Sequence, residues 1–310
     1  MDSLEFLDPF RRLLEAACPP ETARAIEAGG DWRGAWEEVA GSGFLDLLVA
    51  EEAGGAGLTL AEAAPLLALL GAEAVPLPIG ETMIARALLA RAGQAAPAGP
   101  IVLATDRLPT PLARIAGHAL TGSAQAPALV EIAAAEPTGL FNDNDAVLPE
   151  AAPALRPLAA VLRAQLIAGA LGALLEMTVG YANERSQFGK PVGRQQAVQQ
   201  QLAVLAEQAL AARIAAAIGA RAGLEAGLRE AAIAKHGASR AAAHAAAIAH
   251  AVHGAIGISE EHGLQRLTRR LRIWRLSSGS EGYWARQLGE AMAAGIRQQR
   301  PLARMVVGLD

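Results

Sequence analysis

The chain has 310 residues, of which 52% are hydrophobic, 4% aromatic and 19% charged, and its formal net charge is −4. This acidic balance argues against nucleic acid as a main partner, and the single cysteine, Cys18, excludes an intramolecular disulfide and fits a reducing cytosol. The length suits two or three domains. Because aromatic residues are few, the core must be built from Ala, Leu, Val and Ile, and alanine-rich segments favour helix over strand.

The chain shows no pattern typical of targeting or of metal binding. Its first residues, MDSLEFLDPFRRLLEAA, are amphipathic and acidic and lack the basic start and apolar centre of a signal peptide. No run reaches about 18 uninterrupted apolar residues, so no membrane span is expected. His244, His250 and His253 lack the inward carboxylates that a metal site in a helical bundle needs. We therefore expect a cytoplasmic protein with no metal ion and no membrane partner.

Residues 1–94 are predicted to form an N-terminal helical domain. Apolar residues recur at helical spacing through most of this part. Thr59 and Glu62 have the spacing of a capping box, which begins a helix over 60–70. A further helix is expected over 81–92.

Residues 95–150 differ in character and are predicted to form a shortened β domain. Pro and Gly are frequent there, and three short apolar runs, IVLAT, HALTG and ALVEIA, alternate with turns in the way that strands do. The polar segment 142–145 is expected to be a turn.

Residues 151–310 are predicted to form a C-terminal helical bundle. Helices are expected over 157–184, 195–224, 229–252, 260–275 and 281–294. Long amphipathic helices joined by short loops predict an antiparallel four-helix bundle. The predicted fold class is therefore mainly α, with a reduced β region between two helical domains.

Three motifs carry a family resemblance. The stretch YANERSQFGKPVGRQQAVQQQLAVL, residues 181–205, resembles the acyl-CoA dehydrogenase hallmark, which is a tyrosine, then R-x-x-F-G-K-P-I and a glutamine-rich helix. VAEEAGGAGLTLAEAA is similar to the family's P-E-x-x-G-G-x-G-L segment, and HAVHGAIGISEEHGLQRLTRR to its glycine turn and arginine-rich helix. The resemblance covers nearly the whole chain and implies the fold predicted above. The region 95–150 departs from it, being much shorter than the family's β domain and lacking a recognisable T-E-x-x-A-G-S-D loop.

The resemblance implies that Arg185, Gln187 and Phe188 bind FAD held by a neighbouring subunit. A guanidinium group suits the pyrophosphate because its fork of donors pairs two oxygens at once. The alternative is a surface arginine in a connection between helices. Gln196 and Gln199 share one helix face, which would contact the cofactor or a dimer partner, or would be an exposed polar face.

Gly254 and Gly257 match the family's glycine turn, whose backbone approaches the FAD of the partner subunit. Two positions are altered, because Ala255 stands where a second glycine is usual and Ala251 stands where the family has a pyrophosphate-contacting glutamine. A methyl group narrows the approach of a ligand. The alternative for this segment is a plain helix C-cap.

The resemblance also locates the catalytic base. The family uses a glutamate to remove the α-proton of an acyl-CoA thioester while the β-hydride leaves to the flavin, and this position holds Ser278 here. A serine hydroxyl is far too weak a base for that step. Glu281 lies three residues further on, and is either a substitute base or a first-turn glutamate favoured by the helix dipole.

An arginine cluster on the helix predicted over 260–275 leaves two alternatives open. The cluster would bind CoA or cofactor phosphates, or it would form a solvated or interface face paired with Glu260 and Glu261. Its members are Arg266, Arg269, Arg270, Arg272 and Arg275.

Two functions are compatible with these residues. The first is an FAD-dependent acyl-CoA dehydrogenase that forms a 2-enoyl thioester as a homodimer or homotetramer, with Glu281 as its base. The second is a non-catalytic paralogue that has lost FAD, the base or both, and that pairs with a full-length acyl-CoA dehydrogenase in a heteromer. In the family, some such heteromers act on steroid side chains.

Overall fold

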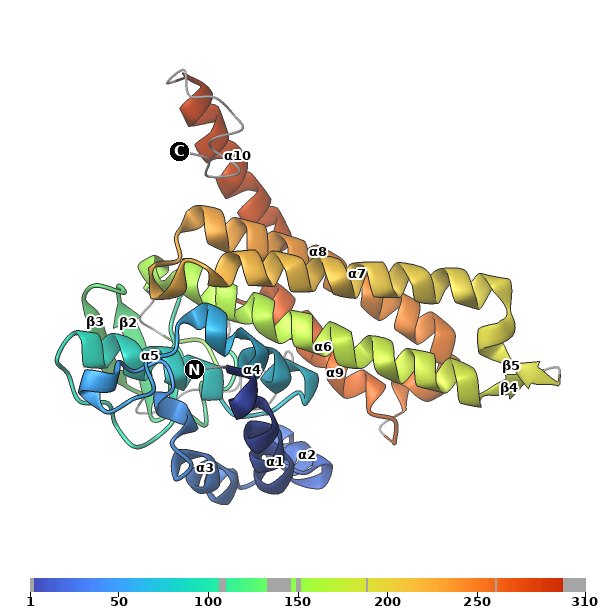
Figure 1. Ribbon diagram of the computed structural model, residues 1–310, viewed down its shortest axis with the longest axis horizontal. Helices are drawn as coiled ribbons and strands as arrows, with labels where there is room; N and C mark the ends of the chain where they lie inside the picture. Colours follow the sequence, from blue (N-terminus) through green and yellow to red (C-terminus); the bar gives the residue numbers. More distant parts are fainter. Residues whose placement is uncertain are drawn as a thin grey trace.

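The computed structural model describes residues 3–105, 110–132, 146–148, 152–187, 189–259 and 261–297. Figure 1 shows a group of short helices beside a small sheet, a bundle of long helices next to both, and a last helix that projects from the bundle. The predicted fold class is confirmed.

The N-terminal part is helical, as predicted. It contains the 3-10 turns η1 (Ser3–Phe6), η2 (Phe44–Asp46) and η3 (Glu51–Ala53), and the helices α1 (Leu7–Ala17), α2 (Pro20–Glu27), α3 (Arg33–Ala40), α4 (Leu60–Ala72) and α5 (Ile79–Arg91). The capping box at the start of α4 is confirmed, because the amide of Thr59 donates to the carboxylate of Glu62 at 2.8 Å and the amide of Glu62 donates to the Thr59 hydroxyl at 3.2 Å. Both bonds satisfy amide groups that a helix start otherwise leaves without a partner.

The middle part forms a three-stranded sheet. The strands are β1 (Ile101–Leu103), β2 (His118–Gly122) and β3 (Pro127–Glu131), which coincide with the three predicted runs. β2 lies in the centre, parallel to β1 and antiparallel to β3. The turn predicted over 142–145 lies outside the described residues.

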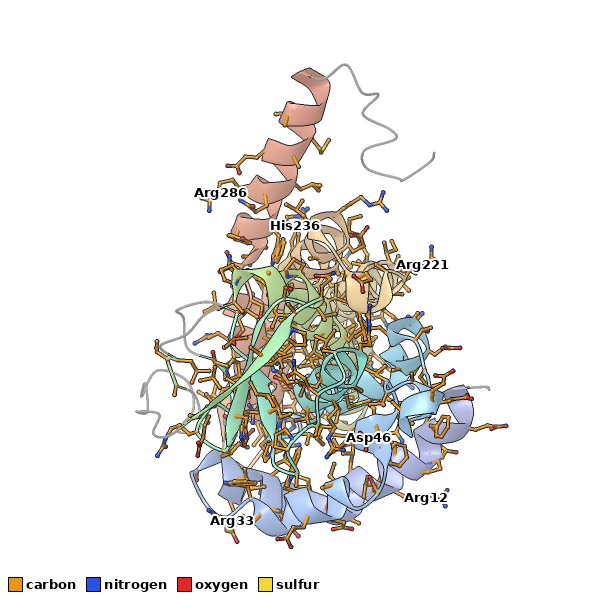
Figure 2. All side chains as sticks on the ribbon, turned by 90° about the vertical axis from the view of Figure 1, so that its left-hand side faces the viewer. Arg12, Arg33, Asp46, Arg221, His236 and Arg286 are labelled. Atoms are coloured by element: carbon orange, nitrogen blue, oxygen red, sulfur yellow. The ribbon has the colours of Figure 1, made fainter. Side chains whose placement is uncertain are left out.

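The C-terminal part is an antiparallel bundle of four long helices followed by a fifth. The helices are α6 (Arg156–Glu184), α7 (Gln196–Ala220), α8 (Leu228–His253), α9 (Leu264–Leu276) and α10 (Glu281–Arg297), with short 3-10 turns η4 (Pro153–Leu155), η5 (Val192–Arg194), η6 (Gly223–Glu225) and η7 (Gly254–Ile258). Figure 2 looks along the bundle and shows α10 standing clear of it. α7 ends earlier than predicted, because the chain turns at Gly223, whose φ of +61° lies in the left-handed region that a helix cannot continue through.

Two glycines bring α4 and α6 into backbone contact. A Cβ atom on Gly71 would lie 2.0 Å from the carbonyl oxygen of Leu166, and a Cβ atom on Gly169 would lie 1.7 Å from that of Ala68. Neither position can hold a side chain unless the two helices move apart. The glycines therefore fix how the N-terminal part sits on the bundle.

A buried ion pair strengthens the same junction. Arg163 on α6 donates to Glu81 on α5 at 2.5 Å, and the two side chains are 3% and 4% exposed. Loss of either partner would leave an unpaired charge in the core.

Among the residues that the structure describes, three helical segments are long and apolar enough to cross a membrane by length and composition alone: Pro153–Glu184, Gln196–Ala220 and Leu228–Ile258. The first of them is 78% buried over its apolar window, so most of its apolar surface packs in the bundle core. The expectation of a cytoplasmic protein without a membrane span stays a prediction.

Candidate functional site

Arg185 lies at the end of α6, at the entry to a short β-hairpin. The hairpin pairs β4 (Ser186–Gln187) with β5 (Lys190–Pro191), and Gly189 turns it with φ +77°. The sequence predicts a turn here, and in the structure this turn joins the two strands of a hairpin. Arg185 and Gln187 are both exposed, whereas Phe188 lies outside the described residues.

The glycine turn begins where α8 ends. Gly254 has φ +63° and ψ −141°, a conformation that strains any residue with a side chain, and its amide donates to the His250 carbonyl. Gly257 is buried, and a Cβ atom there would lie 2.7 Å from Leu264 and 3.0 Å from the Cβ of His253. Gly254 thus sets the course of the chain, and Gly257 makes room for close packing.

These two turns border one groove of about 650 Å³, which we call the Arg185 groove. Gln196 and Gly257 do not line it, although both were predicted to act here. Gln196 is exposed in the first turn of α7, and Gln195 and Gln201 face the groove instead. The lining residues are Tyr181, Arg185, Gln187, Val192, Gln195, Val198, Gln201, Ala251, Val252, His253, Gly254, Ala255 and Ile256.

Tyr181 and His253 stack against each other in this groove, with their rings 4.4 Å apart and 22° from parallel. The Tyr181 hydroxyl donates to the carbonyl of His253 at 3.3 Å, so the tyrosine ties the end of α6 to the end of α8. The third ring, His262, meets His253 edge-on at 4.9 Å. In the sequence Tyr181 stands out only as part of a motif, and no local pattern indicates its contact with His253.

His253 leaves one buried acceptor without a partner. Its Nδ1 lies 2.8 Å from the Ala249 carbonyl, which can only accept, so Nδ1 carries the proton. Burial lowers the pKa of His253, and His262 and His250 add to this, although the bond to Ala249 opposes it. The ring is therefore neutral near pH 7. Its Nε2 is a buried acceptor that no group in the described part of the chain satisfies.

The donor set of the Arg185 groove fits a phosphorylated ligand. Arg185 offers a guanidinium fork, Gln187, Gln195 and Gln201 offer amides, and Gly254 keeps the backbone free of a side chain. The unpaired Nε2 of His253 in the same wall is an acceptor, so it suits a hydroxyl or N–H group of the ligand and not a phosphate oxygen. Ala251 lines the groove and has no donor to offer a phosphate.

Ser278, which the family resemblance places at the base position, is buried in the turn between α9 and α10. It is 5% exposed with φ +56°, and its Oγ lies 3.4 Å from the Thr105 Oγ1. Its carbonyl accepts a hydrogen bond from the Trp284 indole at 3.0 Å. The hydroxyl therefore packs against Thr105, the second residue after β1.

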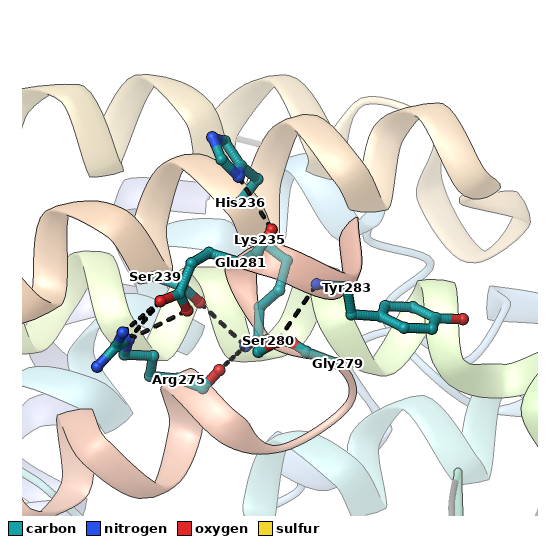
Figure 3. Close-up of polar contacts among 8 residues, drawn as sticks. All are labelled: Lys235, His236, Ser239, Arg275, Gly279, Ser280, Glu281 and Tyr283. Atoms are coloured by element: carbon teal, nitrogen blue, oxygen red, sulfur yellow. Dashed lines mark hydrogen bonds and ion pairs between the residues drawn. The ribbon is translucent and has the colours of Figure 1, made fainter. Parts of the chain in front are cut away.

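Lys235 holds this turn from beneath. It is fully buried, and its ammonium donates to the Ser239 hydroxyl at 3.0 Å and to the carbonyls of Arg275 and Gly279 at 2.8 and 2.9 Å (Figure 3). An ammonium group has three donors, and these bonds occupy all of them. The course of the turn from 275 to 279 is thus fixed from α8.

Glu281, the alternative base, is held in an ion pair. Arg275 Nε donates to the two oxygens of Glu281 at 3.0 and 3.1 Å, and a second guanidinium nitrogen also bonds the carboxylate (Figure 3). Burial acts to raise the pKa of Glu281, but the bonds and charge of Arg275, together with the charge of Lys235, outweigh it and hold the pKa below its usual value. A catalytic carboxylate requires a shift in the other direction.

Replacement of Glu281 by Gln should remove stability that depends on pH. Because the pKa of Glu281 is lowered by folding, the ion pair stabilises the fold above the unfolded-state pKa and is lost as the pH falls through the folded-state value. We expect Glu281→Gln to cost about 1 kcal/mol at neutral pH, and the difference from wild type to shrink as the pH falls below the ordinary glutamate pKa of about 4.3. Urea unfolding from pH 7 to pH 3 measures it, with the exposed Glu207→Gln as control. A difference that is the same at both ends of this range would contradict the ion pair.

The arginine cluster divides between two faces of α9. Arg270 is buried and pairs with Glu27 at 3.0 Å, and Arg266 donates to the Glu73 carbonyl at 2.8 Å, so both attach α9 to the N-terminal part. The other three members, Arg269, Arg272 and Arg275, line a groove between α8 and α9. The predicted partner Glu260 lies outside the described residues.

Family models match both helical parts of the chain. The model of the acyl-CoA dehydrogenase C-terminal domain matches residues 158–293, and that of the N-terminal domain matches residues 2–97. Acyl-CoA dehydrogenase IpdE2 of Mycobacterium tuberculosis is 33% identical over 219 residues, which are 62% of this chain and 66% of that relative. The matched part thus spans about two thirds of the length of IpdE2.

Solved structures share the whole fold. The chain is similar to the crystal structure of the ChsE4-ChsE5 complex from Mycobacterium tuberculosis with a TM-score of 0.80 at 22% identity, covering 94% of this chain and 97% of that one. A variant of the Tcur3481-Tcur3483 steroid ACAD gives a TM-score of 0.80 at 23% identity, covering 95% and 98%. By its two domain models and its sequence relatives, the chain belongs to the acyl-CoA dehydrogenase family.

Proposed function

We propose that this chain is the partner subunit of a heteromeric acyl-CoA dehydrogenase. In this proposal a second chain of the same family binds most of the FAD and supplies the catalytic carboxylate. The present chain contributes the Arg185 groove to the phosphates of that FAD across the subunit interface. Bound FAD would accept the hydride that leaves the β-carbon of the acyl-CoA.

The observation that carries the proposal is the state of the two candidate bases. Ser278 is buried against Thr105, and Glu281 is bound by Arg275 with its pKa lowered. Neither group is suited to take a proton from the α-carbon of a thioester. The groove at the other turn, by contrast, keeps an arginine, three amides and an open glycine backbone.

Solved relatives support a two-chain assembly. ChsE4-ChsE5 is described as a complex, and Tcur3481-Tcur3483 as a steroid ACAD named by two chains. We therefore propose an acyl-CoA thioester as the substrate of the assembly, with steroid side-chain thioesters as the class to test first.

The visible spectrum tests the proposal. The chain purified alone should be colourless and should take up no added FAD. After co-expression with a full-length acyl-CoA dehydrogenase chain from the same genome, a 1:1 complex should show flavin bands at roughly 370 and 450 nm. Acyl-CoA should then bleach the band near 450 nm. Tight FAD binding and bleaching by the chain alone, with no heteromer formed, would overturn the proposal.

The competing function is an autonomous dehydrogenase with Glu281 as its base. The intact Arg185 groove favours it, since a homodimer would present the same groove to its own FAD. The Glu281→Gln variant separates the two functions. Under our proposal the heteromer containing Glu281→Gln reduces its flavin at the wild-type rate, whereas an autonomous enzyme would lose reduction by acyl-CoA.

A further inference from the structure

A second groove, of about 430 Å³, runs between α8 and α9. We call it the α8–α9 groove. It is separate from the Arg185 groove, with which it shares no lining residue. Its lining residues are Ala242, Ala243, Ala246, Ala247, His250, Ile258, Gln265, Thr268, Arg269, Leu271, Arg272 and Arg275.

The α8 side of this groove is made of four alanines, with His250 at its end. Ala243, Ala246 and Ala247 lie one helical turn apart on one face of α8, and Ala243 and Ala247 are exposed. Methyl side chains let the backbone of another helix approach to about 8–10 Å between axes. The shape of this side therefore suits a helix better than a compact ligand.

The α9 side carries three guanidinium groups. Arg269, Arg272 and Arg275 follow each other at every third residue, and the lining residues include no aspartate or glutamate. Arg275 pairs with Glu281, which lies outside the lining. Arg272 is exposed and forms no hydrogen bond or ion pair within the described part of the chain. A helix lying in this groove would need acidic side chains along the edge that faces α9.

Exposed isoleucines on η7 connect the two grooves. Ile258 is 73% exposed and lines the α8–α9 groove, and Ile256 is 39% exposed and lines the Arg185 groove. Exposed apolar side chains in grooves that also contain arginines are typical of an interaction surface. A partner that shares the cofactor at Arg185 would therefore continue across η7 into the α8–α9 groove.

A second copy of this chain is a poor occupant. A two-fold axis beside α9 would bring the exposed Arg272 of one copy towards Arg272 of the other. Like charges placed opposite each other disfavour such a pairing. The groove thus selects against self-pairing and for a chain of complementary charge.

We propose that the α8–α9 groove binds an amphipathic, acidic helix of the catalytic partner subunit. In this arrangement the apolar face of the partner's helix lies on Ala243 and Ala247, and its acidic edge pairs with Arg272. One end of the partner's helix covers Ile258. The proposal rests on the heteromer described under Proposed function, and it adds which surface selects the partner and by what chemistry.

The affinity of the heteromer tests this directly. The probe is the purified full-length acyl-CoA dehydrogenase chain that forms the 1:1 complex, titrated with wild type and variants by biolayer interferometry. Arg272→Glu reverses the charge, and Ala247→Trp fills the groove from an exposed position. Both should weaken binding by about tenfold or more. Arg12→Glu and Ala16→Trp make the same changes on exposed positions of α1, where Figure 2 labels Arg12, and should leave binding unchanged.

Salt and charge rescue complete the test. Raised ionic strength should weaken wild-type binding more than Arg272→Glu binding. Replacing one glutamate of the partner's helix by arginine should restore affinity for Arg272→Glu and for no control variant. If the complex forms but Arg272→Glu and Ala247→Trp bind like wild type, this inference is wrong while the proposed function stands. If no complex forms with wild type, both are overturned.

Discussion

Replacing Gly169 with alanine should destabilise the protein more than any other single methyl addition described here. The new Cβ would lie 1.7 Å from the carbonyl oxygen of Ala68, which is a backbone atom in the middle of α4. No rotamer change relieves that overlap, so α4 must move away from α6. We expect a loss of about 3 kcal/mol or more in the free energy of unfolding, measured by urea denaturation followed by circular dichroism.

Gly172, three residues further along α6, offers a matched control. A Cβ atom there has no neighbour within 4 Å, so Gly172→Ala should be neutral or should stabilise the helix by about 0.5–1 kcal/mol. The sign of the effect should thus reverse within one turn of α6. Equal effects at the two positions would mean that the close crossing of α4 and α6 does not exist in solution.

Replacing Arg185 with alanine should lower the affinity of the heteromer for FAD. Arg185 is the one guanidinium group among the residues that line its groove, and a charge-assisted hydrogen bond contributes about 1.5–3 kcal/mol. The dissociation constant for FAD should therefore rise by roughly ten- to a hundredfold. Fluorescence titration of the flavin-free heteromer with FAD measures this without reference to turnover.

Arg194→Ala is the control for this variant. Arg194 is exposed on η5, near the hairpin, but does not line the groove. The Arg194→Ala variant removes one positive charge from the same region as Arg185→Ala does. A general loss of positive potential would therefore weaken FAD binding equally in both variants. Equal weakening, or no weakening at Arg185, would exclude a direct contact between Arg185 and the cofactor.

Local chemistry made the elements of this fold predictable from sequence. The Thr59–Glu62 capping box and the start of α6 near Pro157 depend on residues close in the chain, and both are as predicted. The close crossing of Gly71 and Gly169 depends on two helices nearly a hundred residues apart, which no local pattern encodes. The reduced β region was also predicted, because strand and turn signals are short-range.

The candidate site was predictable only in part. Motif matching led to Arg185 and Gly254, which the structure brings to one groove. The motif indicated Gln196, but Gln195 and Gln201 face the groove instead. The direction in which a side chain points depends on the residue at which its helix starts, and α7 starts at Gln196. The pairing of Glu281 with Arg275 was not foreseen, since the two residues belong to different helices joined by a turn whose path Lys235 sets.

The hydrogen bonds of Lys235 affect whether a glutamate can be accommodated at position 278. Its ammonium is committed to the turn that carries Ser278, and the turn buries that position beside Thr105. A glutamate appearing at 278 by a single mutation would have to enter this packed space and would disturb the bonds of a fully buried cation. A base at 278 would therefore require coordinated changes on α8 and in the turn. If the chain depends on a catalytic partner as proposed, a single substitution at 278 would not remove that dependence.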